Sequence, residues 1–188
     1  MANKTTTPDD VLNFWFEQHG QSDWWQSSDA FDEKVRDQFG DTLEAAGAGE
    51  LSAWRDTPHG RLAEIIVLDQ FSRQIHRGSG QAYAYDAQAR ALAQEAVRQG
   101  DHEKLTTEQR HFMLMPYMHA ESLVVHDEGL PLFEALENEQ ALKFSQGHRS
   151  VVERFGRYPT RNAVLGRANT PQEAAYLAER DLDGGTPV

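Results

Sequence analysis

The chain has 188 residues, with 30 Asp or Glu against 18 Lys or Arg, so its net charge at pH 7 is -12. That charge argues against a protein whose whole surface binds nucleic acid or anionic lipid. The absence of cysteine excludes thiol nucleophiles, Cys-ligated zinc and iron–sulfur clusters. A chain of this length is expected to form a single domain over 1–188, with frayed tails at 1–7 and 182–188.

The first residues lack the apolar stretch of a signal peptide. The apolar runs at 65–68 and 112–115 are far too short to span a bilayer. We therefore expect a soluble, cytoplasmic protein with neither membrane nor nucleic acid as a partner.

Thr–Pro pairs mark the starts of three predicted helices, at Thr7-Pro8, Thr57-Pro58 and Thr170-Pro171. Thr caps backbone N–H groups and Pro suits the first helical position, while Glu173 completes a capping box with Thr170. The apolar spacing is helical along most of the chain, and period-two alternation is hard to find. The predicted helices span, in chain order, 8–19, 29–47, 58–76, 83–99, 107–119, 130–138, 139–155 and 171–181.

Short connections between these helices favour antiparallel packing of sequential neighbours. The sequence therefore predicts an all-α fold of about seven to nine helices, arranged as an antiparallel helix-pair array without a sheet. Five aromatic residues in the first 25 positions are expected to seal its core, with the lining of an apolar ligand pocket as the alternative. They are Phe14, Trp15, Phe16, Trp24 and Trp25.

The stretch 149–167, called the Arg segment below, has a local charge of +4 and leaves -16 for the rest of the chain. Arg can hold a carboxylate or phosphate through two hydrogen bonds, and Tyr158 and Asn162 could stack on and orient a ligand. The segment thus favours a small-anion site, unless its guanidinium groups pair with acidic helix faces elsewhere. Its charged residues are Arg149, Glu153, Arg154, Arg157, Arg161 and Arg167.

Asp69, Arg73, His76 and Arg77 have the spacing of residues on one helical face, if the helix runs that far. They could form the second wall of a basic cleft with the Arg segment. The alternative is that Asp69 and Arg73 pair simply to support their own helix.

Histidines and acids between 111 and 126 invite a metal interpretation, but their spacing is poor. His119 and Glu121 are two residues apart and point to different sides of a helix, and Pro116 interrupts the segment before them. We therefore expect no metal and no cofactor. His119 and Glu121 are instead expected to line the same cleft as polar groups.

Three blocks carry a resemblance to a known family: 51–77 with its Leu68-Asp69-Gln70-Phe71, 114–121, and 148–167 with its Arg154-Phe155-Gly156-Arg157-Tyr158. In their order and spacing they resemble the bacterial domain-of-unknown-function family 924 over essentially the whole chain. The resemblance implies an all-α, tetratricopeptide-like fold and no established activity. The chain departs from the family pattern at Ser72, where Pro is usual, and at Thr160, where His is usual, which argues against a mechanism that depends on that His.

Two functions are compatible with these observations. One is an interaction module that holds a peptide or protein partner on a concave, basic face, as tetratricopeptide-like folds often do. The alternative is a protein or enzyme that binds a small anionic phosphate or carboxylate metabolite, with catalytic residues left unassigned. In that case the anion would be bound by Arg73, Arg77, Arg154, Arg157 and Arg161. The ligand would be oriented by Asn162 and Tyr158, and protons would be transferred by Asp69, His76, His119 or Glu121.

Overall fold

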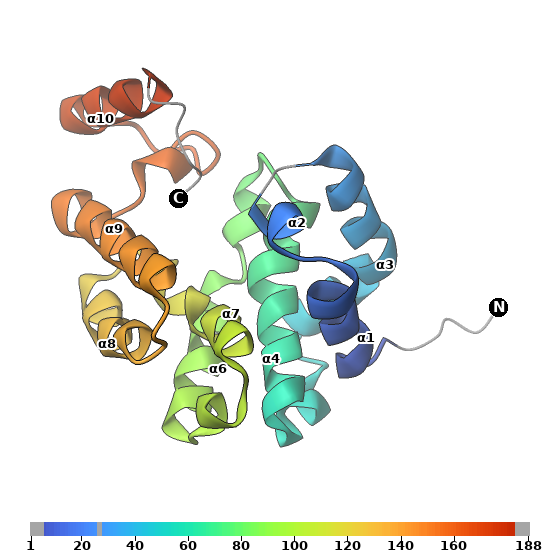
Figure 1. The fold of residues 1–188 in the computed structure, drawn as a ribbon. Helices are drawn as coiled ribbons and strands as arrows, with labels where there is room; N and C mark the ends of the chain where they lie inside the picture. The colour runs from blue at the N-terminus through green and yellow to red at the C-terminus, as the bar shows by residue number, and fades with distance from the viewer. Residues whose placement is uncertain (1–5, 26–27, 183–188) are drawn as a thin grey trace. The chain divides into compact units, whose positions relative to one another are not determined.

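The computed structural model describes residues 6–25 and 28–182, and these residues form helices joined by short turns (Figure 1). No strand occurs in these ranges, which confirms the predicted all-α class. Within the same ranges, no helix combines the length and apolar character that crossing a membrane requires. The expected frayed ends fall almost entirely outside the described residues.

The chain divides into two compact units. Unit 1 comprises residues 1–77 and 81–116, and unit 2 comprises 78–80 and 117–188. The expectation of one domain stays a prediction, and each unit is described by itself.

The Thr–Pro pairs start helices as predicted. Thr7 accepts a hydrogen bond from the backbone N–H of Asp10, and Thr57 accepts one from Gly60. Thr170 accepts one from the N–H of Glu173, whose carboxylate accepts in turn from the N–H of Thr170. The caps thus satisfy N–H groups that lack partners within the first turn.

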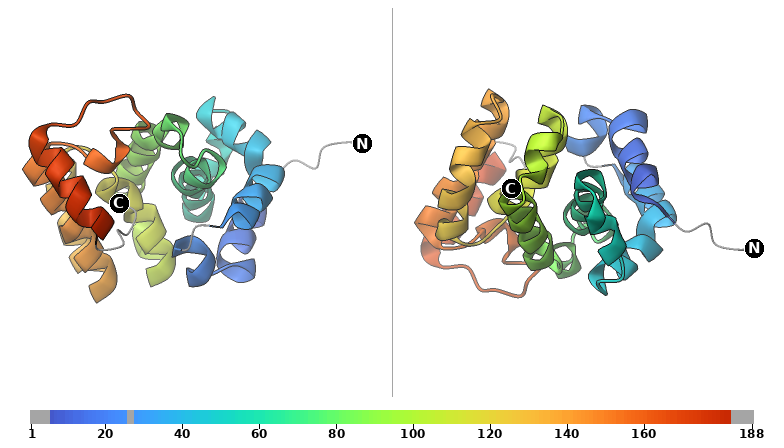
Figure 2. Two further views of the ribbon diagram at one scale, coloured as in Figure 1. Left: turned by 90° about the horizontal axis from the view of Figure 1, so that it is seen from above. Right: turned by 90° about the horizontal axis from the view of Figure 1, so that it is seen from below.

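Unit 1 is built around a helical run from Pro58 to Ile75. Apolar residues from Leu62 to Phe71 are buried along this run, which explains its position between α3 and α6 (Figure 2). A π-helical segment, η3, interrupts the run, so the side chains do not keep the spacing of an uninterrupted α-helix. The elements of the unit are α1 (Pro8–Leu12), η1 (Asn13–Gln18, also π-helical), α2 (Gln21–Trp25), α3 (Asp29–Gly47), η2 (Ser52–Asp56), α4 (Pro58–Ile66), η3 (Val67–Phe71), α5 (Ser72–Ile75), η4 (Gly80–Tyr83), α6 (Asp86–Arg98), η5 (Asp101–Lys104) and α7 (Thr107–Met118). The first residue of η4 and the last two of α7 are assigned to unit 2.

Aromatic side chains form the core of unit 1. All four tryptophans of the chain belong to this unit. The buried Trp15 ring lies with its centroid 5.8 Å from that of Trp24, 5.6 Å from Phe71 and 5.4 Å from Phe112. These contacts join four segments of the unit. Phe14, Trp15 and Trp24 are buried and therefore serve as core, as the first of the two sequence interpretations predicted, whereas the side chain of Trp25 lies outside the described residues.

Unit 2 contains α8 (Leu123–Glu134), α9 (Glu139–Phe155), η6 (Pro159–Arg161) and α10 (Pro171–Leu182). Helices α8 and α9 form an antiparallel pair (Figure 1). The prediction of a helix over 130–138 had the wrong bounds, since α8 spans Leu123–Glu134. Gly129 and Pro131 resemble helix breakers in the sequence, but Gly129 lies inside α8, where a Cβ atom would come within 2.8 Å of the Tyr117 side chain.

Candidate functional site

The Arg segment runs from the end of α9 through a tight turn into η6 and the loop before α10. Gly156 ends α9 with a φ of 71°, a conformation that side chains with a Cβ rarely adopt. The turn places Tyr158 against Met118 at the end of α7 and against Glu121, which follows that helix. Local backbone geometry therefore decides where the charges of the segment point.

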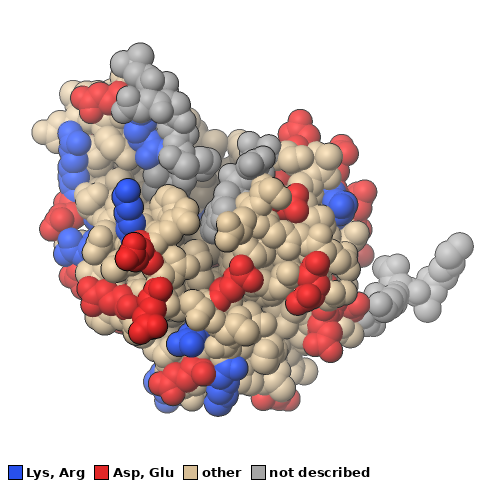
Figure 3. Space-filling view, in the orientation of Figure 1, with Lys and Arg blue, Asp and Glu red and all other residues tan. Residues whose placement is uncertain are grey.

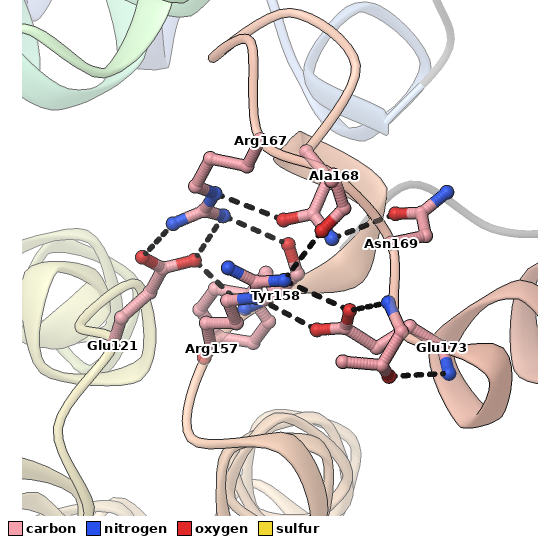
Figure 4. Close-up of polar contacts among 9 residues, drawn as sticks. Glu121, Arg157, Tyr158, Arg167, Ala168, Asn169 and Glu173 are labelled. Carbon is pink, nitrogen blue, oxygen red and sulfur yellow. Dashed lines mark hydrogen bonds and ion pairs between the residues drawn. The ribbon is translucent and has the colours of Figure 1, made fainter.

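Glu121 receives three hydrogen bonds from this segment (Figure 4). Arg167 binds it through two nitrogens, with N–O distances of 2.6 and 2.8 Å, and the N–H of Tyr158 donates to it at 2.7 Å. A further bond from Arg167 reaches the Tyr158 carbonyl at 3.2 Å. Burial raises the pKa of Glu121, but the bonds from Arg167 and Tyr158 outweigh it and the net pKa is lowered. Glu121 is therefore held as an anion that ties the segment down.

A second acid, Glu173, anchors the other end of the segment. Glu173, in the first turn of α10, accepts from Arg157 at 2.7 and 2.9 Å. The bonds from Arg157 hold the pKa of Glu173 at about 2. Asn162 accepts from Arg167 and donates to Asn169 between these anchors. We call Glu121, Arg157, Arg167 and Glu173 the ion-pair network.

A second group, the histidine cluster, lies in the same unit and consists of His119, His126 and His148 with Tyr158 and Arg161. The guanidinium carbon of Arg161 lies 4.5 Å from the centroid of the buried Tyr158 ring, and Arg161 donates to the His119 carbonyl at 3.0 Å. The His148 ring centroid lies 5.8 Å from that of Tyr158 and 6.3 Å from that of His119. Three imidazoles, a phenol and a guanidinium thus occupy one small region.

Hydrogen bonds to carbonyl oxygens fix the proton positions of two of these imidazoles. Tyr158 donates its hydroxyl proton to the Met118 carbonyl at 2.5 Å, and His126 Nε2 lies 2.9 Å from the Ala120 carbonyl. A carbonyl only accepts, so His126 Nε2 carries hydrogen and its buried Nδ1, which has no hydrogen-bond partner among the described residues, is bare in the neutral ring. His148 Nδ1 donates to the Phe144 carbonyl at 2.8 Å by the same logic, which leaves its Nε2 as the bare nitrogen.

Burial lowers the pKa of His126, and burial together with the neighbouring His119 lowers that of His148 to about 3. Both rings are therefore neutral near pH 7. Chemically, they can accept hydrogen bonds, whereas a pKa near 3 makes His148 a weak general base.

Acidification is expected to destabilise the protein through His148. As pH falls through 6.5 the unfolded chain takes up a proton at this residue, but the folded chain does so only near pH 3. The free energy of unfolding should therefore fall between pH 7 and 5, by about 1–2 kcal/mol from this residue alone. Urea unfolding of the wild type and of His148→Gln at both pH values measures this contribution, and equal pH dependence of the two proteins would contradict it.

The second wall expected from the sequence lies in unit 1. Asp69 is buried and pairs with Arg73 at 3.1 Å, and Arg73 also pairs with Asp86 on α6 at 3.0 Å. Arg77 binds the buried Asp32 of α3 through two nitrogens. The helix ends at Ile75, so His76 and Arg77 lie beyond it and the four residues do not form one continuous helical face.

The sequence-predicted residues thus fall into separate groups. Asp69, Arg73, His76 and Arg77 belong to unit 1 and the others to unit 2. In unit 2 the structure brings together the ion-pair network and the histidine cluster, which include the predicted His119, Glu121, Arg157, Tyr158 and Arg161. The predicted Asn162 lies beside the network, where it accepts from Arg167. Arg154 lies apart, on the exposed side of α9.

Sequence reasoning did not select the second Glu of the network or two of the three histidines. Glu173 carried a signal as part of a capping box, but its bond to Arg157 spans 16 residues. His126 was among the residues of the rejected metal interpretation, and His148 carried no signal in its spacing. In the described ranges, no group of three or more His, Asp or Glu residues is arranged to hold a metal ion.

Comparisons with known proteins place the chain in a family. The model of a family described as a bacterial protein of unknown function, DUF924, matches residues 11–181. A solved structure of a protein of unknown function from Agrobacterium tumefaciens is 37% identical, covers 92% of this chain and 97% of its own, and superposes with a TM-score of 0.87. The curated proteins gave no match. The chain therefore belongs to the DUF924 family of bacterial proteins.

Proposed function

We propose that the chain is an interaction module that binds a protein partner through unit 2. The observation that carries this proposal is an asymmetry in apolar exposure. Every large apolar side chain that is exposed in the described ranges belongs to unit 2: Val124 (77%), Phe144 (44%), Leu165 (38%) and Val164 (36%).

These side chains occur on three parts of the unit. Val124 is in the first turn of α8, Phe144 is on α9, and Val164 and Leu165 follow η6. A partner that covered them would gain about 25 cal/mol for each Å² of apolar surface removed from water. Unit 1 buries its large apolar residues in its own aromatic core, which suits a scaffold rather than a binding surface.

A small-anion site has weaker support. Three of the arginines expected to hold the anion already bind carboxylates: Arg73 binds Asp69 and Asp86, Arg77 binds Asp32, and Arg157 binds Glu173. An incoming anion would have to displace these carboxylates. Such pairs agree better with the structural alternative considered for the Arg segment.

Site-specific photo-crosslinking in the native bacterium tests the proposal. We expect the photoreactive amino acid p-benzoylphenylalanine to give one discrete protein adduct when it replaces Phe144 or Val124. The control position is Gln38, which is exposed on α3 of unit 1 and should give no such adduct. The absence of adducts from unit 2, or the same adduct from position 38, would overturn the proposal.

A further inference from the structure

Arginine and aromatic side chains meet on the surface formed by the end of α9 and the middle of α10. We call this the Arg154 surface, and it consists of Arg154, Phe155, Tyr176 and Arg180. The Phe155 and Tyr176 rings join the two helices, with centroids 5.0 Å apart. On the face drawn in Figure 3, Lys and Arg side chains lie over this part of unit 2.

Both cations of the surface lie against these rings. The guanidinium carbon of Arg154 is 4.7 Å from the Phe155 centroid and 5.9 Å from that of Tyr176. That of Arg180 is 5.8 Å from the Tyr176 centroid, and Arg180 also donates to the Tyr176 hydroxyl at 3.2 Å. Contact with the rings restricts the flexible Arg154 side chain while its N–H groups remain able to donate.

Arg154 differs from its neighbours in the Arg segment. Arg149 binds Asp127 and Glu153, Arg157 binds Glu173, and Arg167 binds Glu121. Arg154 is exposed and forms no ion pair with any residue that the structure describes. In an acidic chain, this cation is placed to bind a carboxylate from another molecule.

We infer that the Arg154 surface binds a carboxylate side chain in an acidic segment of the protein partner. This inference rests on the proposed function and adds the chemistry of the partner to it. The guanidinium fork of Arg154 matches the two oxygens of a carboxylate, and the Phe155 and Tyr176 rings offer apolar area beside it.

Fluorescence anisotropy with a labelled, Glu-rich decapeptide and its Gln-substituted counterpart tests this inference on the full chain. We expect the Glu peptide to bind more tightly than the Gln peptide, and Arg154→Ala to weaken its binding about fivefold. Arg154→Lys should recover only part of the loss, because Lys keeps the charge but not the planar fork. The matched control is Lys143→Ala, which removes an exposed cation from the same helix and should change binding less than twofold.

Three results would overturn the inference. They are no binding of the Glu peptide, equal weakening by Arg154→Ala and Lys143→Ala, and tighter binding of a single-stranded DNA of equal charge. Circular dichroism of each variant checks that the fold is kept. Failure here with persisting adducts from positions 124 and 144 would overturn only the acidic partner, whereas loss of those adducts would overturn the proposed function.

Discussion

Replacing Trp15 by alanine is expected to lower the free energy of unfolding by about 3–5 kcal/mol. The side chain is fully buried, and its ring contacts Trp24, Phe71 and Phe112 from three other segments of unit 1. Its Nε1 has no hydrogen-bond partner among the described residues, so the loss is one of packing. Alanine would leave a cavity that the surrounding rings fill only in part.

Urea unfolding followed by circular dichroism measures this change. Val124→Ala is the control, because its side chain is 77% exposed and its removal should cost less than about 0.5 kcal/mol. Similar losses for the two variants would contradict the central position of Trp15 in the core.

Replacing Tyr158 by alanine is expected to destabilise unit 2 by about 3 kcal/mol or more. The buried ring packs beside Arg161 and His148, and its hydroxyl bonds to the Met118 carbonyl and His126. The substitution therefore removes packing and hydrogen bonds together. Hydrogen exchange measured by mass spectrometry should show faster exchange in α8 and α9.

Tyr158→Phe separates the two contributions, because it keeps the ring and removes only the hydroxyl. The loss should then be about 1–2 kcal/mol, since the Met118 carbonyl loses a donor while the ring packing is retained. If Phe were as destabilising as Ala, packing of the ring would not be the main contribution.

Helices with clear caps could be predicted from the sequence, and those without could not. The bounds of α3 and α9 agree with the predicted 29–47 and 139–155, because Ser28 and Asn138 cap their starts and Gly156 ends the second. Helix α8 was misplaced because its Ser122 cap makes no side-chain hydrogen bond and its interior contains Gly and Pro. The π-helical segments at 13–18 and 67–71 depend on packing within unit 1, which local spacing does not record.

The residue types of the candidate site could be predicted more fully than their partners. The excess of Arg at 149–167 was visible, and so was its alternative interpretation as a set of ion pairs. The acids that bind Arg157 and Arg167 lie 16 and 46 residues away, so their identity depends on tertiary structure. Ser72 illustrates the same limit. Its hydroxyl donates to the carbonyls of Gln81 and Ala82. The presence of Ser where the family usually has Pro did not predict these hydrogen bonds.

The confinement of all four tryptophans to unit 1 gives the protein a built-in optical reporter. Tryptophan emission follows the environment of unit 1, whereas circular dichroism follows the helices of both units. Denaturation curves that coincide for the two signals would mean that the units unfold as one cooperative system, and curves that separate would mean that they unfold in steps. The natural sequence thus allows the cooperativity of the two units to be measured without introducing a label.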